Sequence, residues 1–360
     1  MKPIYISATL QDSGKTSVTL GLMQMLQEKG LNPGYCKPVG QHYVRYHEKN
    51  IDEDGVLIHQ VFHLDDEPYY LSPIAIERDF TRKFINNPDV KPMEKEIIRC
   101  HEELLKKHSM VIVEGTGHAG VGSCFGLSNA RVAELLDAKV VIVTSGGIGR
   151  PIDEIAMSLA LFKDHHVDVI GVILNKVLVE KYEKVKDTVA KGLKLLGTRL
   201  IGAIPYDRSL TTFSVGQLAE EFNYQIFCGE DALSNVIEDT VIAAMEPQNM
   251  LRYINTNTLV IIPGDRIDNI LVSLLILSKD TTNGGMILTG GFEPHPSIEP
   301  LLKSSRIPIL ISSEDTFKVS ARMKDLGFKI RSWDTAKVHR LRQLVEEHVE
   351  TDLVLEALKA

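Results

Sequence analysis

The sequence predicts an α/β protein: a mostly parallel sheet with helices on both faces, followed by a smaller α/β domain. Two observations lead to this prediction. Short β-branched runs alternate with longer amphipathic stretches over residues 1–210, which is the order expected when parallel strands are joined by right-handed helical crossovers. Several of these runs are apolar throughout, as is typical of strands that are buried on both faces.

The larger domain is expected over residues 1–230. Its strands are the short apolar runs at 4–8, 35–38, 110–114, 140–144, 169–174 and 200–204. Its helices are the stretches with apolar residues at helical spacing, at 15–29, 52–63, 93–108, 128–137, 151–165, 180–196 and 214–222. Each long stretch separates two strands, so the strands are expected to run parallel.

The strand and helix pattern weakens after residue 225, and a linker is expected at 231–250, around Pro247-Gln248-Asn249. A second α/β domain is expected over residues 251–360. Its expected strands are 258–262, 286–288 and 308–311, and its expected helices are 267–278, 297–304, 314–326 and 336–350.

Composition limits the classes of partner. The 360 residues carry a formal net charge of −8, which argues against nucleic-acid binding through a basic surface. The four cysteines are widely spaced and form no C-x-x-C pair, so neither a zinc site nor a disulfide framework is expected. No apolar run reaches the roughly 18 residues of a membrane span, and the first residues enter a strand pattern directly. We therefore expect a cytoplasmic protein with neither nucleic-acid nor membrane partners.

Residues 9–16 read TLQDSGKT and lie between an expected strand and an expected helix, which is the setting of a phosphate-binding loop. Gly14 lets the backbone approach a phosphate, Lys15 is placed to reach the β- and γ-phosphates of ATP, and Thr16 is placed to hold Mg²⁺. The usual pattern, G-x-x-x-x-G-K-[ST], has Gly where this chain has Thr9, so the alternative is a helix start that reads GKT by chance. We expect six consecutive residues to bind the nucleotide: Asp12, Ser13, Gly14, Lys15, Thr16 and Ser17.

Further polar residues follow the ends of expected strands. Glu114 is placed as a second Mg²⁺ ligand, or it is an exposed residue that begins a turn. Lys37 either points into the same site or stays solvated. Asp52 and Asp54 begin a helix, where acids favour the helix dipole whatever the function, and either one is a candidate metal ligand. Asn175 is placed to recognise a base, or it caps a turn.

The first 220 residues resemble the dethiobiotin synthetase and cobyrinic acid a,c-diamide synthase group of P-loop proteins. That group replaces the first Gly of the loop, as TLQDSGKT does. Its Lys-Pro-Val and Val-Glu-Gly motifs match Lys37-Pro38-Val39 and Val113-Glu114-Gly115, and its metal-binding Asp matches Asp54, with Asp52 still open. The resemblance implies a P-loop NTPase-type sheet, with ATP and Mg²⁺ as cofactors. It also implies catalytic roles for Lys15 and Lys37, and Mg²⁺ binding by Thr16, Asp54 and Glu114.

A second resemblance covers almost the whole chain. The segments GTGHAGVGS, SGGIGRPIDE and GDR…LTGG resemble the N-terminal half of long bacterial phosphate acetyltransferases, in which a dethiobiotin-synthetase-like domain precedes a DRTGG domain. The acetyltransferase catalytic domain has no counterpart here, so acetyl transfer by this chain alone is not expected. Residues 245–360 contain no Cys, so a glutaminase domain is not expected either.

Two functions follow as expectations. The first is an ATP-dependent ligase or synthetase that activates a carboxylate or carbamate of an unknown small molecule by phosphoryl transfer. The second is a regulatory protein that senses a nucleotide or metabolite without catalysis. The related synthetases pair as dimers, so a homodimer is expected in either case.

Overall fold

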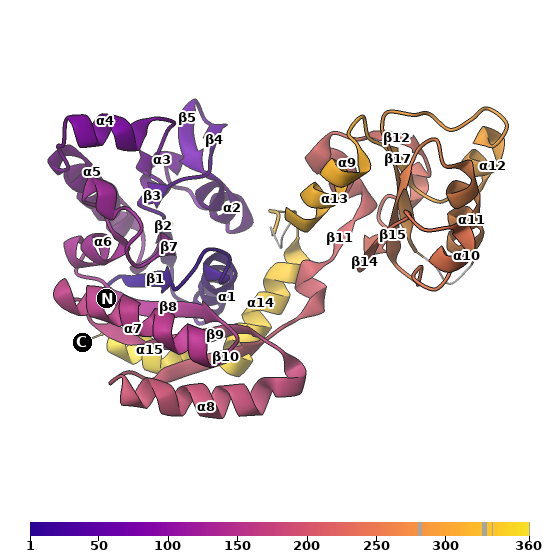
Figure 1. The fold of residues 1–360 in the computed structure, drawn as a ribbon. Coiled ribbons are helices and arrows are strands. Elements are labelled where there is room, and N and C mark those ends of the chain that lie inside the picture. The colour runs from indigo at the N-terminus through magenta and orange to yellow at the C-terminus, as the bar shows by residue number, and fades with distance from the viewer. Residues whose placement is uncertain (280–282, 326–329, 333, 360) are drawn as a thin grey trace. The chain divides into compact units, whose positions relative to one another are not determined.

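The computed structural model describes residues 1–279, 283–325, 330–332 and 334–359, and it divides the chain into two compact units (Figure 1). The first unit consists of Met1–Asp207 together with Ile330–Ala360, and the second is Arg208–Lys329. The chain therefore leaves the first unit, builds the second and returns to the first.

The first unit is built on a six-stranded sheet in which every neighbouring pair of strands is parallel. In sheet order its strands are β10 (Leu200–Pro205), β9 (Val169–Val177), β8 (Lys139–Ser145), β1 (Ile4–Ala8), β7 (Met110–His118) and β2 (Pro33–Cys36). Nearly all of their residues are buried, which confirms the interpretation of the apolar runs as strands covered on both faces.

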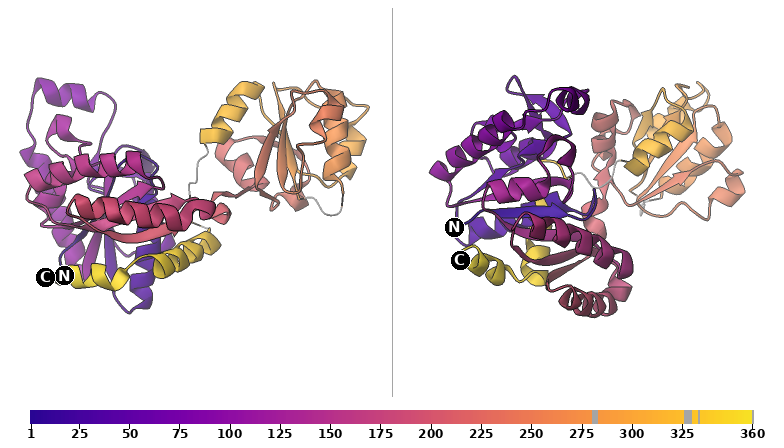
Figure 2. Two further views of the ribbon diagram at one scale, coloured as in Figure 1. Left: turned by 60° about the horizontal axis from the view of Figure 1, so that its bottom comes forward. Right: turned by 60° about the vertical axis from the view of Figure 1, so that its left-hand side comes forward.

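Helices cover both faces of this sheet (Figure 2). Right-handed crossovers place α1 on one face and four helices on the other, and α14 packs beside α1. These helices are α1 (Lys15–Glu28), α5 (Lys91–Lys107), α6 (Asn129–Leu135), α7 (Gly149–Asp164), α8 (Tyr182–Leu195), α14 (Thr335–His348) and α15 (Thr351–Ala357).

Short elements between β2 and α5 complete the first unit. They are β3 (Val39–Gly40), the hairpin of β4 (Tyr43–Tyr46) and β5 (Lys49–Asp52), α2 (Glu53–Val61), α3 (Pro68–Leu71), β6 (Ile74–Ala75) and α4 (Phe80–Asn86), while the 3-10 turns η1 (Ser123–Phe125) and η2 (Val179–Lys181) lie further along the chain. The sequence pattern predicted only the helix at 52–63 among them, because the others are too short to show a periodic apolar pattern.

The second unit has a five-stranded sheet with core clusters on both faces. In sheet order its strands are β12 (Gln225–Cys228), β17 (Ile309–Ile311), β16 (Gly285–Thr289), β15 (Thr258–Pro263) and β14 (Asp239–Ile242), and β12 alone is antiparallel to its neighbour. The remaining elements are η3 (Arg208–Thr211), β11 (Phe213–Ser214), α9 (Val215–Phe222), η4 (Glu230–Ala232), β13 (Val236–Ile237), α10 (Pro247–Met250), α11 (Ile267–Leu277), α12 (Glu299–Ser304) and α13 (Thr316–Asp325). The predicted fold class, a mostly parallel helix-covered sheet followed by a smaller α/β domain, is confirmed.

The division between the units differs from the expected boundaries. Residues 231–250 were expected to be a linker, but they contribute β13, β14 and α10 to the second unit. The helix expected at 336–350 in the second domain is α14, which belongs to the first unit. The physical reason lies in α1: a Cβ on Gly21 would meet the Leu341 carbonyl oxygen at 2.8 Å and Val345 Cγ2 at 2.5 Å, so the two helices pack at close range.

No helix within the described ranges combines the length and the apolar character needed to cross a lipid bilayer.

Candidate functional site

The loop between β1 and α1 presents unpaired backbone N–H groups. Gly14 caps α1 in the left-handed region at φ 92°, and Asp12 has φ 60°. Within the described residues, no protein acceptor takes the N–H groups of Ser13, Gly14 or Lys15. Successive free N–H groups at a helix N-terminus form a concave site for a phosphate, because they add to the positive end of the helix dipole.

Side chains hold this loop in place. The Ser13 hydroxyl donates to the Leu10 carbonyl at 3.0 Å. The Thr9 hydroxyl pairs with the hydroxyl of Thr144 on β8 at 2.8 Å. The residue that departs from the usual loop pattern therefore anchors the loop to the neighbouring strand. The side-chain amide of Asn175, at the end of β9, donates to the Ser13 carbonyl at 3.0 Å.

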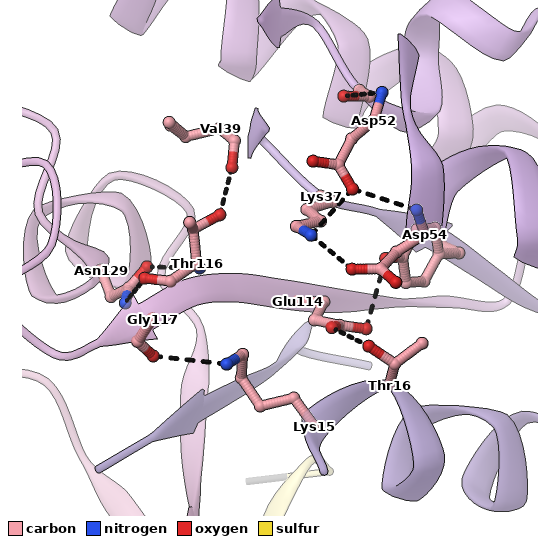
Figure 3. A network of polar contacts seen from close by, with 12 residues as sticks. Lys15, Thr16, Lys37, Val39, Asp52, Asp54, Glu114, Thr116, Gly117 and Asn129 are labelled. Carbon is pink, nitrogen blue, oxygen red and sulfur yellow. Dashed lines mark hydrogen bonds and ion pairs between the residues drawn. The ribbon is translucent and has the colours of Figure 1, made fainter. Parts of the chain in front are cut away.

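Thr16 contacts Glu114 at the centre of the site, and Lys15 lies nearby (Figure 3). The Thr16 hydroxyl donates to Glu114 Oε1 at 2.7 Å, and the Tyr35 hydroxyl donates to Glu114 Oε2 at 3.3 Å. Lys15 Nζ lies 3.4 Å from the Gly117 carbonyl oxygen. Glu114 is 1% exposed, so it is not the exposed turn residue that the sequence left open.

Lys37 lies between two carboxylates. Its Nζ is 2.8 Å from Asp52 Oδ1 and donates to Asp54 Oδ2. Asp52 also caps α2, since its Oδ1 accepts the N–H of Asp54 at 3.0 Å. Lys37 is buried rather than solvated, and its ammonium group is already paired within the protein.

The pKa values reflect three neighbouring carboxylates, of which Asp52 and Glu114 are buried and Asp54 is partly exposed. Burial, together with the nearby Asp54 carboxylate, raises the pKa of Glu114 to about 7, and burial also raises the pKa of Asp52. Burial lowers the pKa of Lys15. Burial opposes the charge of Lys37 too, but the Asp54 and Asp52 carboxylates hold its pKa above its ordinary value. With every group ionised, three carboxylates and two ammonium groups leave the cluster with a net negative charge. That charge favours the binding of a further cation.

The oxygen atoms present fit Mg²⁺. The Thr16 hydroxyl and the Asp54 and Glu114 carboxylates are hard oxygen donors. Asp52 Oδ2 is buried and has no hydrogen-bond partner within the described residues, a further sign of unmatched negative charge. Among the residues that the structure describes, no cluster of three or more His, Cys, Asp or Glu forms a ready-made metal site. Mg²⁺ does not need one when it is bound by one or two carboxylates together with nucleotide phosphates.

The structure also reveals a site residue that the sequence analysis missed. Asn129, near the start of α6, accepts the N–H of Thr116 at 3.1 Å and the Tyr5 hydroxyl at 2.9 Å. Its amide donates to the carbonyls of Thr116 and His118 at 2.9 and 2.6 Å. These bonds fix the end of β7, just beyond Glu114. Their only sequence signal is an Asn after the helix-capping Ser128, which does not identify a distant partner.

The structure thus brings Lys15, Thr16, Lys37, Asp54 and Glu114 into one polar network (Figure 3). Ser17 lies in the first turn of α1. Both ends of the Asn175 side chain have partners inside the protein, because its Oδ1 accepts the N–H of Lys176 at 2.9 Å.

Comparison with known proteins identifies two domains. The family described as "AAA domain" (AAA_26) matches residues 2–214, and the family described as "DRTGG domain" matches residues 217–326. The chain is 28% identical to a phosphate acetyltransferase of Nitratidesulfovibrio vulgaris over 97% of this chain and 50% of that protein. It is 24% identical to one of Synechocystis sp. over 99% of this chain and 52% of that protein.

The chain spans about half the length of the curated relatives it matches. Among solved structures it is similar to the MinC:MinD cell division protein complex of Aquifex aeolicus, with 14% identity and a TM-score of 0.38 over 58% of this chain and 84% of that one. The family matches and the relatives confirm the predicted resemblance: a P-loop domain followed by a DRTGG domain, as in the N-terminal half of phosphate acetyltransferases.

Proposed function

The chain belongs to the AAA-domain family through residues 2–214, and on this premise we propose that it binds ATP with Mg²⁺ and transfers the γ-phosphoryl group to a small-molecule acceptor. The observation that carries the proposal is the meeting of Thr16 with Glu114 at 2.7 Å, beside Lys15 and next to a loop with unpaired N–H groups.

Each residue has a role in this proposal. The loop N–H groups hold the β-phosphate, and Lys15 neutralises charge on the β- and γ-phosphates. Thr16, Asp54 and Glu114 hold Mg²⁺, which when bound neutralises the charge that develops on the phosphates. Lys37 positions Asp54 through their ion pair. Catalysis then rests on positioning and charge neutralisation, because phosphoryl transfer asks for little covalent chemistry from the protein.

The acceptor proposed for this reaction is a carboxylate or carbamate, which would form an acyl phosphate and release ADP. In this scheme the acceptor oxygen forms a bond to the γ-phosphorus as the bond from that phosphorus to the β–γ bridging oxygen breaks. An amine can then displace the phosphate from the acyl phosphate.

Titration calorimetry with Mg²⁺–ATP tests the binding proposal. Lys15→Ala is expected to weaken binding at least about tenfold, because it removes a buried cation that faces the phosphates. Lys29→Ala is the matched control, since Lys29 follows the other end of α1 and pairs with Asp352 on the surface at 2.8 Å. Equal affinity of the Lys15→Ala variant and the wild type would refute the site.

A second function is supported by a specific observation. Lys37, for which the resemblance implies a catalytic role, is already paired with Asp52 and Asp54. This favours a regulatory module that binds Mg²⁺–ATP without turning it over, related to the accessory region of the acetyltransferases. ADP release measured over hours separates the two functions: turnover that depends on an added carboxylate supports phosphoryl transfer, and tight binding without turnover supports regulation.

A further inference from the structure

Two consecutive residues near the end of β9 donate side-chain hydrogen bonds to two consecutive carbonyl groups of the phosphate-binding loop. Asn175 Nδ2 donates to the Ser13 carbonyl at 3.0 Å. Lys176 Nζ donates to the Asp12 carbonyl at 2.8 Å. We refer to Asn175 and Lys176 together as the β9 clamp.

The β9 clamp determines where the loop N–H groups point. In a trans peptide the C=O and N–H groups point in opposite directions. The Asp12 carbonyl shares a peptide unit with the N–H of Ser13, and the Ser13 carbonyl shares one with the N–H of Gly14. Because both carbonyls are held toward β9, both N–H groups are turned to the opposite side of the loop, where no acceptor within the described residues takes them.

The β9 clamp is built into the fold. Asn175 is 6% exposed, its carbonyl accepts the N–H of Gly146 at 2.7 Å, and its side-chain oxygen accepts the N–H of Lys176. A Cβ on Gly14 would lie 2.1 Å from Asn175 Nδ2, so the amide occupies the space that a side chain at position 14 would need.

Lys176 adopts a strained backbone to take part. Its φ is 58°, a left-handed conformation that costs a residue with a Cβ about 1 kcal/mol or more. Burial also lowers the pKa of its ammonium group. Strain of this kind persists where the surrounding structure requires it, and it is concentrated at functional sites.

We propose that Asn175 and Lys176 are positioning residues that preorganise the loop for a triphosphate, and that Asn175 does not read the base. The inference rests on the proposed nucleotide binding and deepens it. A clamp that acts through the loop backbone contributes to phosphate binding whatever base is attached. A base-reading amide would contribute only when its base is present.

The test is binding of three probes, each with Mg²⁺: ATP, GTP and inorganic tripolyphosphate, which has no base. Asn175→Ala and Lys176→Met are each expected to weaken binding of all three probes by the same factor, on the order of tenfold, as for loss of one hydrogen bond. Lys176→Arg, which keeps a donor, is expected to restore part of the affinity. Lys191→Met, an exposed lysine on α8, is the matched control and is expected to bind like the wild type.

Lys176→Gly separates positioning from folding. Glycine adopts φ 58° without strain, so this variant is expected to gain stability against urea while it loses affinity for all three probes. A residue with only a structural role would move stability and affinity in the same direction.

Three outcomes distinguish the β9 clamp from base recognition by Asn175 and from a failure of the proposed nucleotide binding. An equal loss for the three probes supports the β9 clamp. A loss for ATP alone, with tripolyphosphate binding unchanged in Asn175→Ala, overturns the clamp and makes Asn175 a base-reading residue. Failure of the wild type to bind any probe overturns the proposed function itself, and it is distinguished from failure of the clamp because it needs no variant.

Discussion

The buried carboxyl group of Glu114 makes the metal-free protein sensitive to pH. Glu114 is 1% exposed and accepts hydrogen bonds from Thr16 and Tyr35, and its pKa rises from 4.5 to about 7. Because the folded pKa is raised, stability is fully present below pH 4.5, where Glu114 is neutral in both states. That stability is lost as the pH rises through about 7, since only the unfolded state ionises freely.

The size of the effect follows from the pKa values. A carboxyl group whose pKa rises from 4.5 to about 7 on folding lowers the free energy of unfolding by roughly 3 kcal/mol above pH 7. Glu114→Gln keeps the shape and an acceptor for Thr16 but removes the charge. We therefore expect Glu114→Gln to be more stable than the wild type by about 2–3 kcal/mol at pH 8, and by much less at pH 5.

The assay is urea denaturation at pH 5 and at pH 8, in excess chelator so that no metal binds. Glu102→Gln is the control, because Glu102 is exposed on α5, and it is expected to change stability little and equally at both pH values. A stability difference between Glu114→Gln and the wild type that is the same at pH 5 and pH 8 would refute the account of Glu114 as a buried, frustrated charge. Added Mg²⁺–ATP is expected to stabilise the wild type more than Glu114→Gln.

Three further predictions concern single positions. Gly14→Ala places a Cβ 2.1 Å from Asn175 Nδ2 at φ 92°, so we expect at least a tenfold loss of Mg²⁺–ATP affinity by calorimetry, and unchanged affinity would contradict the loop geometry. Gly21→Ala places a Cβ 2.8 Å from the Leu341 carbonyl oxygen; it is expected to lower the free energy of unfolding by about 1–3 kcal/mol in urea, and a neutral effect would argue against close packing of α1 on α14. Burial lowers the pKa of His101 from 6.5 to about 4. The protein therefore keeps its full stability above pH 6.5, where His101 is neutral in both states, and loses stability as the pH falls through 4. As the pH falls from 6.5 to 4, we expect the free energy of unfolding of the wild type to drop by roughly 2–3 kcal/mol more than that of His101→Leu. If the free energies of unfolding of the two proteins change in parallel with pH, His101 is not responsible.

Most strands of the first sheet were predictable because they are apolar runs between amphipathic stretches, whereas the run expected at 35–38 covers only the last two residues of β2. The run at 4–8 is β1 to the residue, and the run at 110–114 is the first part of β7. The hairpin of β4 and β5 was missed because its two short strands carry only Ile51 and Asp52 as buried residues, so no repeated buried pattern marks it.

The position of α14 could not be predicted from local sequence. Its apolar residues show that the helix buries one face, but they do not show which part of the chain that face packs against. The partner is α1, more than 300 residues earlier in the chain, through contacts such as Arg342 Nη1 with Glu28 Oε2 at 3.2 Å. The expected boundary assigned the helix to its neighbours in sequence, whereas packing assigns it to the first unit.

Within the site, the sequence analysis placed Lys15, Thr16, Asp54 and Glu114 because each has a recognisable position at a strand or helix end. The resemblance favoured Asp54 as the metal ligand and left Asp52 open. The structure distinguishes their contacts: Asp52 caps α2 and pairs with Lys37, while Asp54 lies near both Lys37 and Glu114. Hydrogen bonds that join distant segments, such as those of Asn129, have no spacing rule in the sequence, and so they could not be predicted.

The interrupted first unit has a consequence for the order of folding during synthesis. The second unit is continuous, so all of Arg208–Lys329 is synthesised before Ile330–Ala360. The first unit is complete only when that later segment has been made. In the folded unit α14 covers α1, and the Lys2 N–H donates to the Leu358 carbonyl. Domains otherwise tend to fold in order from the N-terminus. We therefore expect the α1 face of the first unit to stay uncovered during synthesis until the second unit and the segment Ile330–Ala360 have been made.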